Sequence, residues 1–291
     1  MELFLQTFLN GLLVGAGYAL IAVGLTLVFG ILGIVNFAHG AYFALGAYSV
    51  LLAVNLGVPY LLAVLIALGI VVIAAYLTEL FIVRRSLYGA GNYSSVIVTF
   101  ALSQAMISLM LLIAGPNPQP VASPFSDASM SIFALVFSGQ RILILVVALV
   151  VLSGLGFWLR FARSGRQVTA VSQNARGALY TGINVPRIRS LSFMIGVGAA
   201  GLAGSLLAPI SNVFPTMGNA SLINSFIVVI LGGMGSISGS LLGALLIGVA
   251  NALFETYVSV PWTPALGWIL VIFVLLVAPQ GLRGKKSKER Y

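Results

Sequence analysis

Long apolar runs separated by short polar segments make up most of this sequence. A helix needs about 20 apolar residues to span the hydrocarbon core of a bilayer, whereas barrel strands alternate polar and apolar positions. The unbroken runs therefore predict membrane-spanning helices. The predicted crossings are residues 5–29, 34–54, 60–83, 94–114, 142–159, 191–210 and 265–278.

Residues 222–254 do not fit one simple crossing. Their first part, "LINSFIVVILGG", is about half a span. It is followed by "GGMGSISG", a turn sequence, and by the apolar return segment "SLLGALLIGVANAL". Because irregular backbone at membrane depth must be shielded by protein or a polar cavity, we expect a hairpin with a short or re-entrant first arm inside the bundle.

These patterns predict an all-α integral membrane protein. We expect a polytopic bundle of about eight spanning helices plus the short or re-entrant segment, forming one transmembrane domain over residues 1–291. Residues 5–54 likewise predict a hairpin with a glycine-rich return arm, and the predicted helix at 60–83 follows it. The two halves therefore indicate a weak internal two-fold repeat, a pattern found in transporters.

Small residues are spaced for close helix packing. Gly11 and Gly15 are four residues apart, and so are Gly235, Gly239 and Gly243. Glycines at this spacing let two helix backbones approach closely in a membrane. We therefore expect most of the 33 glycines to have a packing role.

The composition agrees with a membrane protein. Hydrophobic residues make up 60% of the chain and charged residues only 7%, against about 25% in soluble domains. The net charge of +9 does not indicate nucleic acid, because the basic residues lie in short loops. The absence of cysteine excludes disulfides and thiol catalysis, and the N-terminal segment lacks the features of a cleaved signal peptide.

The basic loops predict the orientation, since cytoplasmic loops are rich in Lys and Arg. Arg84 and Arg85 mark one such loop, residues 161–189 contain the largest, and the tail "GLRGKKSKERY" is the third. We expect an inner-membrane protein with its N-terminus outside and its C-terminus in the cytoplasm.

Asn36 and His39 lie within an apolar segment. On a helix they share a stripe with Gly40 and Phe43, at i, i+3, i+4 and i+7. Such side chains either hydrogen-bond across helices or border a solute path. The few uncharged polar groups suit a neutral or zwitterionic solute. The candidate path residues are Asn36, Phe37, His39, Tyr42, Phe43, Thr99, Ser103, Gln104 and Asn224.

Metal binding and proton transfer are disfavoured. His39 is the only histidine, and no cysteine or spaced carboxylate completes a metal site. A proton relay would need a carboxylate partner. Glu79 lies five residues before Arg84, so we expect it to snorkel or to pair locally. No nucleophile–base set indicates an enzyme.

The segment 161–189 predicts a short helix on the cytoplasmic side. Val171, Ala175, Ala178 and Leu179 fall on one face. Gly182 fits a helix stop, and a proline follows at 186. Since this face is too small to hold a lipid surface firmly, we expect it to dock into a groove of a soluble partner.

Three segments resemble the permeases of branched-chain amino-acid ABC importers, the LivH type. They are "VGLTLVFGILGIVNFAHGAYFALGAY", "VSQNARGALYTGI" and "VVILGGMGSISGSLLGALLIG", spread over residues 23–248. In the second segment the matching positions of the family's coupling loop are Gln173, Asn174, Ala178, Gly182 and Ile183.

The resemblance implies a second homologous permease, two cytoplasmic ATPases, an extracytoplasmic solute-binding protein and surrounding lipid. The chain has no G-x-x-x-x-G-K-[ST] phosphate loop, so the ATPases would hydrolyse ATP and this chain would need no cofactor. The implied coupling residues are Gln173, Asn174, Ala175, Arg176, Gly177, Ala178, Leu179, Tyr180 and Gly182.

Two positions depart from the family pattern. Arg176 stands where an acidic residue is common, and Tyr180 is bulkier than the usual aliphatic residue. Related permeases carry urea, short amides or aromatic acids, so these solutes are alternatives to branched-chain or other hydrophobic amino acids. A self-sufficient secondary transporter and a membrane scaffold protein are further alternatives.

Overall fold

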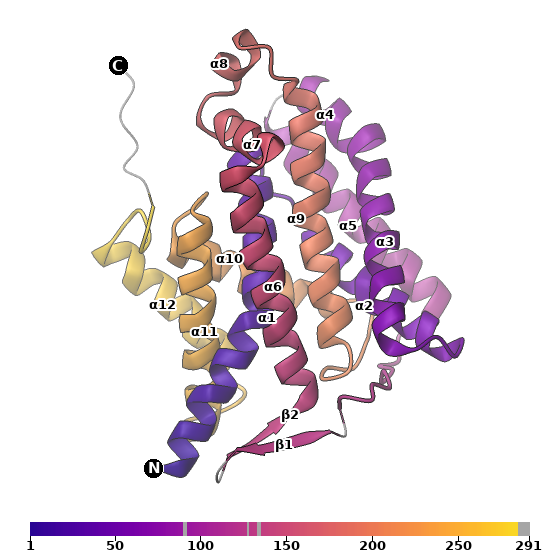
Figure 1. Ribbon diagram of the computed structural model, residues 1–291, viewed down its shortest axis with the longest axis vertical. Helices are drawn as coiled ribbons and strands as arrows, with labels where there is room; N and C mark the ends of the chain where they lie inside the picture. The colour runs from indigo at the N-terminus through magenta and orange to yellow at the C-terminus, as the bar shows by residue number, and fades with distance from the viewer. Residues whose placement is uncertain (90–91, 127, 133–134, 285–291) are drawn as a thin grey trace.

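The chain forms the all-α bundle that the apolar runs predict. The computed structural model describes residues 1–89, 92–126, 128–132 and 135–284. A two-stranded antiparallel hairpin of β1 (Ser129–Ile132) and β2 (Leu135–Ser138) precedes α6 (Figure 1). The helices are α1 (Glu2–Leu32), α2 (His39–Asn55), α3 (Tyr60–Thr78), the π-helix η1 (Glu79–Val83), α4 (Arg84–Gly89), α5 (Asn92–Ala114), α6 (Gly139–Phe161), α7 (Arg163–Gln173), α8 (Ala175–Tyr180), α9 (Val185–Leu207), α10 (Met217–Gly232), α11 (Ile237–Tyr257) and α12 (Thr263–Val277).

Among the described residues, six helical stretches are long and apolar enough to cross a bilayer. They are Glu2–Leu32, Tyr60–Ser86, Ser95–Ala114, Gly139–Phe161, Val185–Leu207 and Ile237–Tyr257. α10 and α12 are apolar but shorter, and α2 has 17 residues. α2 and α12, which the sequence predicts as complete crossings, are thus shorter than the about 20 residues that span a bilayer core.

α1 is the central helix of the bundle. It packs against α6, α9, α10 and α11. Of its apolar stretch of membrane-spanning length, 78% is buried inside the bundle. Gly11 lies against Val249 and Gly15 against Ala244, so the α1 and α11 backbones touch as the glycine spacing predicts. Gly235 is different: it has a φ of 82° and no neighbour that a Cβ would meet, so it serves the turn before α11 and not helix packing.

α2 and α9 are also in close backbone contact. A Cβ at Gly46 would fall on the Gly201 carbonyl, and a Cβ at Gly204 would fall on the Phe43 carbonyl. The Ser205 hydroxyl donates to the Gly46 carbonyl at 3.1 Å. Only glycine at these positions allows this approach, which holds α2 inside the bundle.

α10 and α11 form the expected hairpin with a short first arm. They pack against each other, and Gly232 of α10 touches Gly239 of α11. α2 instead packs mainly on α3, α9 and α10. In the first half the long helix α1 precedes the short helix α2, whereas in the second half the short helix α10 precedes the long helix α11. Since the corresponding arms differ in length, the internal repeat stays a prediction.

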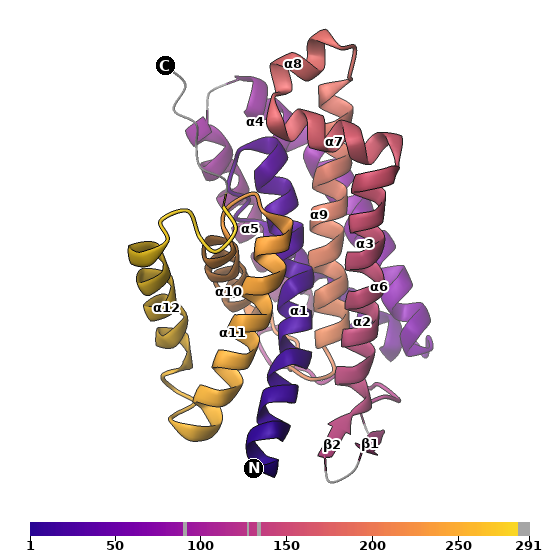
Figure 2. The ribbon, with the colours of Figure 1, turned by 60° about the vertical axis from the view of Figure 1, so that its left-hand side comes forward.

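The two ends of the bundle differ in structure. The N-terminus and the β1–β2 hairpin lie at one end, and α4, α7 and α8 lie at the opposite end (Figures 1 and 2). The basic residues of α7, α8 and α4 thus share one end. The basic tail at 285–291 lies outside the described residues, and the orientation in the membrane stays a prediction.

Candidate translocation cavity and coupling surface

A cavity of about 300 Å³ lies between α1, α2, α6, α10 and the segment that joins α9 to α10. Its walls come from residues that are far apart in the sequence and that helix packing brings together. The lining residues are Leu13, Val14, Tyr18, Phe43, Arg141, Ile144, Leu207, Ile210, Ser211, Phe214, Met217, Ala220, Ser221 and Asn224.

The cavity contains two of the predicted path residues, Phe43 and Asn224. Its single charged lining residue, Arg141, is not among the sequence predictions. The sequence does carry a signal for it, since Arg141 is the only basic residue between Arg85 and Arg160. Apolar walls with a few convergent polar groups are typical of a small-molecule site.

Asn36 and His39 do not line this cavity, and their role in a solute path stays a prediction. Both are fully buried within the bundle. The Asn36 Oδ1 atom accepts a hydrogen bond from the Ala38 amide at 3.1 Å, and the His39 Nε2 atom lies 3.0 Å from the Ile21 carbonyl oxygen of α1. These contacts hold the irregular segment that leads into α2, where orphan amides need partners inside the protein.

Thr99 of α5 supports the same segment. Its hydroxyl accepts from the Phe37 amide at 3.3 Å and lies 3.4 Å from the Val35 carbonyl oxygen. The Phe37 ring lies between Phe100 and Phe226, with centroid distances of 6.3 and 5.8 Å. This part of the predicted path therefore connects α5, α2 and α10.

The remaining predicted path residues divide between core and surface. The Tyr42 hydroxyl contacts that of Thr78, and its ring packs on Phe193 at 6.3 Å. Ser103 is buried on the same face of α5 as Thr99, whereas Gln104 is exposed on another face. Gln104 thus lies outside the interior of this chain, because the two neighbouring positions point in different directions on a helix.

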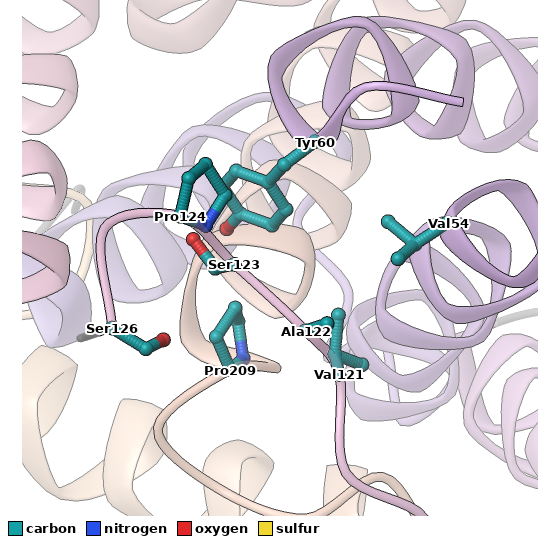
Figure 3. Close-up of a pocket in the computed structure, with 8 residues that line it drawn as sticks. All are labelled: Val54, Tyr60, Val121, Ala122, Ser123, Pro124, Ser126 and Pro209. Carbon is teal, nitrogen blue, oxygen red and sulfur yellow. The ribbon is translucent and has the colours of Figure 1, made fainter. Parts of the chain in front are cut away.

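A second pocket, of about 490 Å³, opens at the end of the bundle that carries the β1–β2 hairpin. Tyr60 and Val54 line it together with the loop residues Ser123 and Pro124 and with Pro209 (Figure 3). Gln140 is buried nearby and donates to the Tyr60 hydroxyl at 2.8 Å and to the Leu206 carbonyl at 2.7 Å. It also accepts from the Ser123 hydroxyl at 2.8 Å, so one side chain joins the loop to α3 and α9.

At the opposite end, residues 161–189 form two helices instead of the one expected. α7 ends at Gln173, and Asn174 has an extended backbone (φ −157°, ψ 98°) that separates it from α8. The Asn174 side chain accepts from the Gly177 amide at 2.9 Å and so caps α8. Gly182, with a φ of 81°, follows α8 as the predicted stop.

The face expected to dock on a partner is only partly turned toward the bundle. Val171 and Ala178 are buried in a cluster with Val185 and Ile188 of α9. Leu179 of the same predicted face is 58% exposed, and the neighbouring Tyr180 is 88% exposed. Part of the predicted docking face is therefore used for packing α7 and α8 onto their own chain, and docking of a partner on this segment stays a prediction.

α9 begins directly after this segment. Asn184 caps it by accepting from the Arg187 amide at 3.1 Å, and Pro186 lies in its first turn. Proline is favoured there because the first amides of a helix have no partner within it. Pro186 therefore starts the next helix, and α9 begins at Val185 and not at 191 as expected.

Comparison with known proteins assigns the chain to a family. The family model described as "Branched-chain amino acid transport system / permease component" matches residues 7–279. The chain belongs to this family of permeases.

Individual relatives agree with this assignment. The permease is 31% identical to the high-affinity branched-chain amino acid transport system permease protein LivH of Escherichia coli (strain K12), over 99% of this chain and 97% of that one. It is 33% identical to BraD of Pseudomonas aeruginosa, over 99% and 98%. The ribose import permease protein RbsC of Haemophilus influenzae is 27% identical, over 92% and 83%.

The fold also has a solved counterpart. A chain of PsaBC from Streptococcus pneumoniae superposes with a TM-score of 0.51 at 12% identity, over 95% of this permease and 92% of that chain. The family assignment and the apolar helices make the permease a multi-pass component of an inner-membrane ABC transport system. It is a transport subunit and not an enzyme, and its family implies ATPase and binding-protein partners.

Proposed function

We propose that this permease forms, with a second homologous permease, the translocation path of an ATP-driven importer for amino acids with apolar side chains. A solute-binding protein delivers the amino acid at the end that carries the β1–β2 hairpin, and two ATPases bind at the α8 end. This arrangement puts the N-terminus outside and the C-terminal tail in the cytoplasm. The names of LivH and BraD support the solute class.

One observation carries the proposal: the two helices that flank the α7–α8 segment both reach the cavity. Arg141 and Ile144 of α6 line the cavity, and α6 leads directly into α7. Four residues separate the end of α8 from the start of α9, and the last residue of α9, Leu207, lines the same cavity. A helix of 23 residues is about 35 Å long, enough to join the two sides of a bilayer.

This connection suggests how ATP hydrolysis would act on the cavity. α7 and α8 both contact α9, and Val171 of α7 and Ala178 of α8 are buried in one cluster with Val185 and Ile188. A displacement of α8 by the ATPases would therefore move α9. α9 in turn is packed on α2 through Gly201 and Gly204, so the walls contributed by Leu207 and Phe43 would shift together.

The exposed surface of α8 is the proposed coupling contact. Tyr180 and Leu179 project away from the bundle beside the exposed Arg176. An aromatic anchor flanked by a cation is a common composition of interface hot spots. The shape of α8 would depend on its small residues Ala175, Gly177 and Ala178 and on Gly182 after it. The edge of this surface would be formed by Gln173 and Asn174.

The remaining apolar surface suits lipid and the second permease. Leu112 of α5 is 83% exposed and Val150 of α6 is 67% exposed. Large exposed apolar surfaces mark contacts with lipid or with another protein. Gln104 lies among the exposed residues of α5, and we place it at the contact between the two permeases.

Purification in a mild detergent, followed by mass spectrometry of the copurifying chains, tests the proposal. The permease should bring two ATPases and a sibling permease with it. Tyr180→Ala should remove most of the ATPase, while Arg166→Ala, an exposed change on α7, should not. Recovery of the permease alone, also after crosslinking, would instead support a self-sufficient transporter.

A further inference from the structure

Arg141 is a cation in a cavity whose lining residues include no acid, and Glu255 lies near one of them, Tyr18. The other lining residues of the cavity are apolar or uncharged. In the described part of the chain, the ion pair present joins Glu79 to Arg84 at the far end of the bundle, and no hydrogen bond engages the guanidinium of Arg141. Arg141 itself is half-buried, and a charged side chain that faces a cavity within a membrane protein is a candidate for a solute pathway.

The position of Arg141 within α6 increases this cost. It lies in the first turn of the helix, where the backbone dipole already places partial positive charge and disfavours cations. An anion held at this point would interact favourably with both the guanidinium and the helix terminus. Arginine in particular presents a planar fork of donors that fits a carboxylate with two parallel hydrogen bonds.

The rest of the cavity defines the other parts of the ligand. Tyr18, Ser221 and Asn224 supply neutral oxygen atoms that can accept from an ammonium group, and no described lining residue is acidic. Phe43, Leu207 and several aliphatic side chains form the remaining wall and suit an apolar group. A volume of about 300 Å³ is at the lower end for ligand pockets, which run from about 300 to 1,000 Å³.

We propose that Arg141 binds the carboxylate of a zwitterionic amino acid in this cavity, with the apolar side chain against Phe43 and Leu207. This inference rests on the proposed function and narrows it. A cation in a cavity without an acidic lining residue selects solutes that carry a carboxylate, and it disfavours urea, amides and sugars, which carry none. The cavity therefore provides a selection step in the membrane in addition to any made by the binding protein.

Protection from phenylglyoxal, an arginine reagent, tests the site in the unaltered complex. Labelling of Arg141, read by mass spectrometry without binding protein present, should slow at least about threefold in the presence of L-leucine. L-leucinamide, which has the same side chain and no carboxylate, should give no protection. Arg85, exposed at the other end of the bundle, should label equally in all samples. Equal labelling of Arg141 with and without leucine would overturn the inference.

Uptake of radiolabelled L-leucine by proteoliposomes, with saturating binding protein, gives the second test. Arg141→Met should reduce the uptake rate about tenfold or more, because a hydrogen-bonded charge pair is lost. Arg141→Lys should retain a larger share of the rate, and Arg85→Met should behave as the unaltered protein. Uptake by Arg141→Met within twofold of normal would overturn the inference. Failure of the ATPases to copurify with the unaltered chain would instead overturn the proposed function.

Discussion

Glu79 and Arg84 form an ion pair of 3.1 Å at the α8 end of the bundle. The Glu79 carboxylate also accepts from the Ser190 hydroxyl of α9 at 2.8 Å, and Arg84 donates to the same hydroxyl oxygen at 2.8 Å. The local pairing that the sequence predicts for Glu79 is thus present. It also includes Ser190 of α9, which lies 106 residues after Arg84 in the sequence. The Glu79 side chain, which is 2% exposed, therefore joins η1 to α9 beside the coupling segment.

Glu79→Leu should therefore destabilise the permease. Removing one partner of a buried pair costs about 3–5 kcal/mol, and we expect about 2–4 kcal/mol here because the Arg84 side chain is 33% exposed. The thermal unfolding midpoint in detergent measures the effect. Glu79→Gln, which keeps an acceptor for Ser190, should lose clearly less. Equal midpoints for Glu79→Leu and the unaltered protein would contradict this role.

Gly46→Leu should disrupt the contact between α2 and α9. A side chain there has no space beside the Gly201 backbone, and overpacking a packed interior costs about 1–3 kcal/mol or more. Gly69→Leu is the matched control, because a Cβ at Gly69 of α3 meets nothing within 4 Å. The yield of monodisperse protein in size-exclusion chromatography should fall for the first variant and stay normal for the second. Similar yields for both would show that the close approach is dispensable.

Asn36→Leu should lower both stability and leucine uptake. It leaves the buried Ala38 amide without its acceptor, at a cost of about 1–3 kcal/mol. Asn36→Ser keeps an oxygen that can accept from this amide and should recover most of both quantities. If Asn36 contacted the solute instead, Asn36→Ser would be stable and still inactive. The thermal midpoint and the uptake rate, measured on the same preparations, separate the two roles.

Asn174→Ala should weaken coupling to the ATPases without unfolding the membrane bundle. The loss of an N-cap costs about 1 kcal/mol, which is large for a helix of six residues. Amide hydrogen exchange of residues 175–180 should become faster, and transport-linked ATP hydrolysis should fall. Asn174→Ser keeps a capping oxygen and should be close to normal. Unchanged exchange in Asn174→Ala would mean that α8 does not depend on this cap.

The sequence determined the class of structure and much of its order. Apolar runs of bilayer length can only be helices or lipid-facing strands, and their lack of alternation excluded strands. The short first arm of α10–α11, the packing role of Gly11 and Gly15 and the stop at Gly182 each follow from local rules of length, spacing and backbone conformation. The three family segments were also sufficient to indicate an ABC permease.

Only the tertiary structure decided which polar residues meet. The sequence left Asn36 and His39 compatible with a solute path and with packing, and the structure brings them to the Ala38 amide and the Ile21 carbonyl at the entrance of α2. Arg141 comes beside Phe43 and Asn224 only because α6, α2 and α10 pack around α1. Periodicity shows which residues share the face of one helix, but the crossing of several helices determines which faces enclose a cavity.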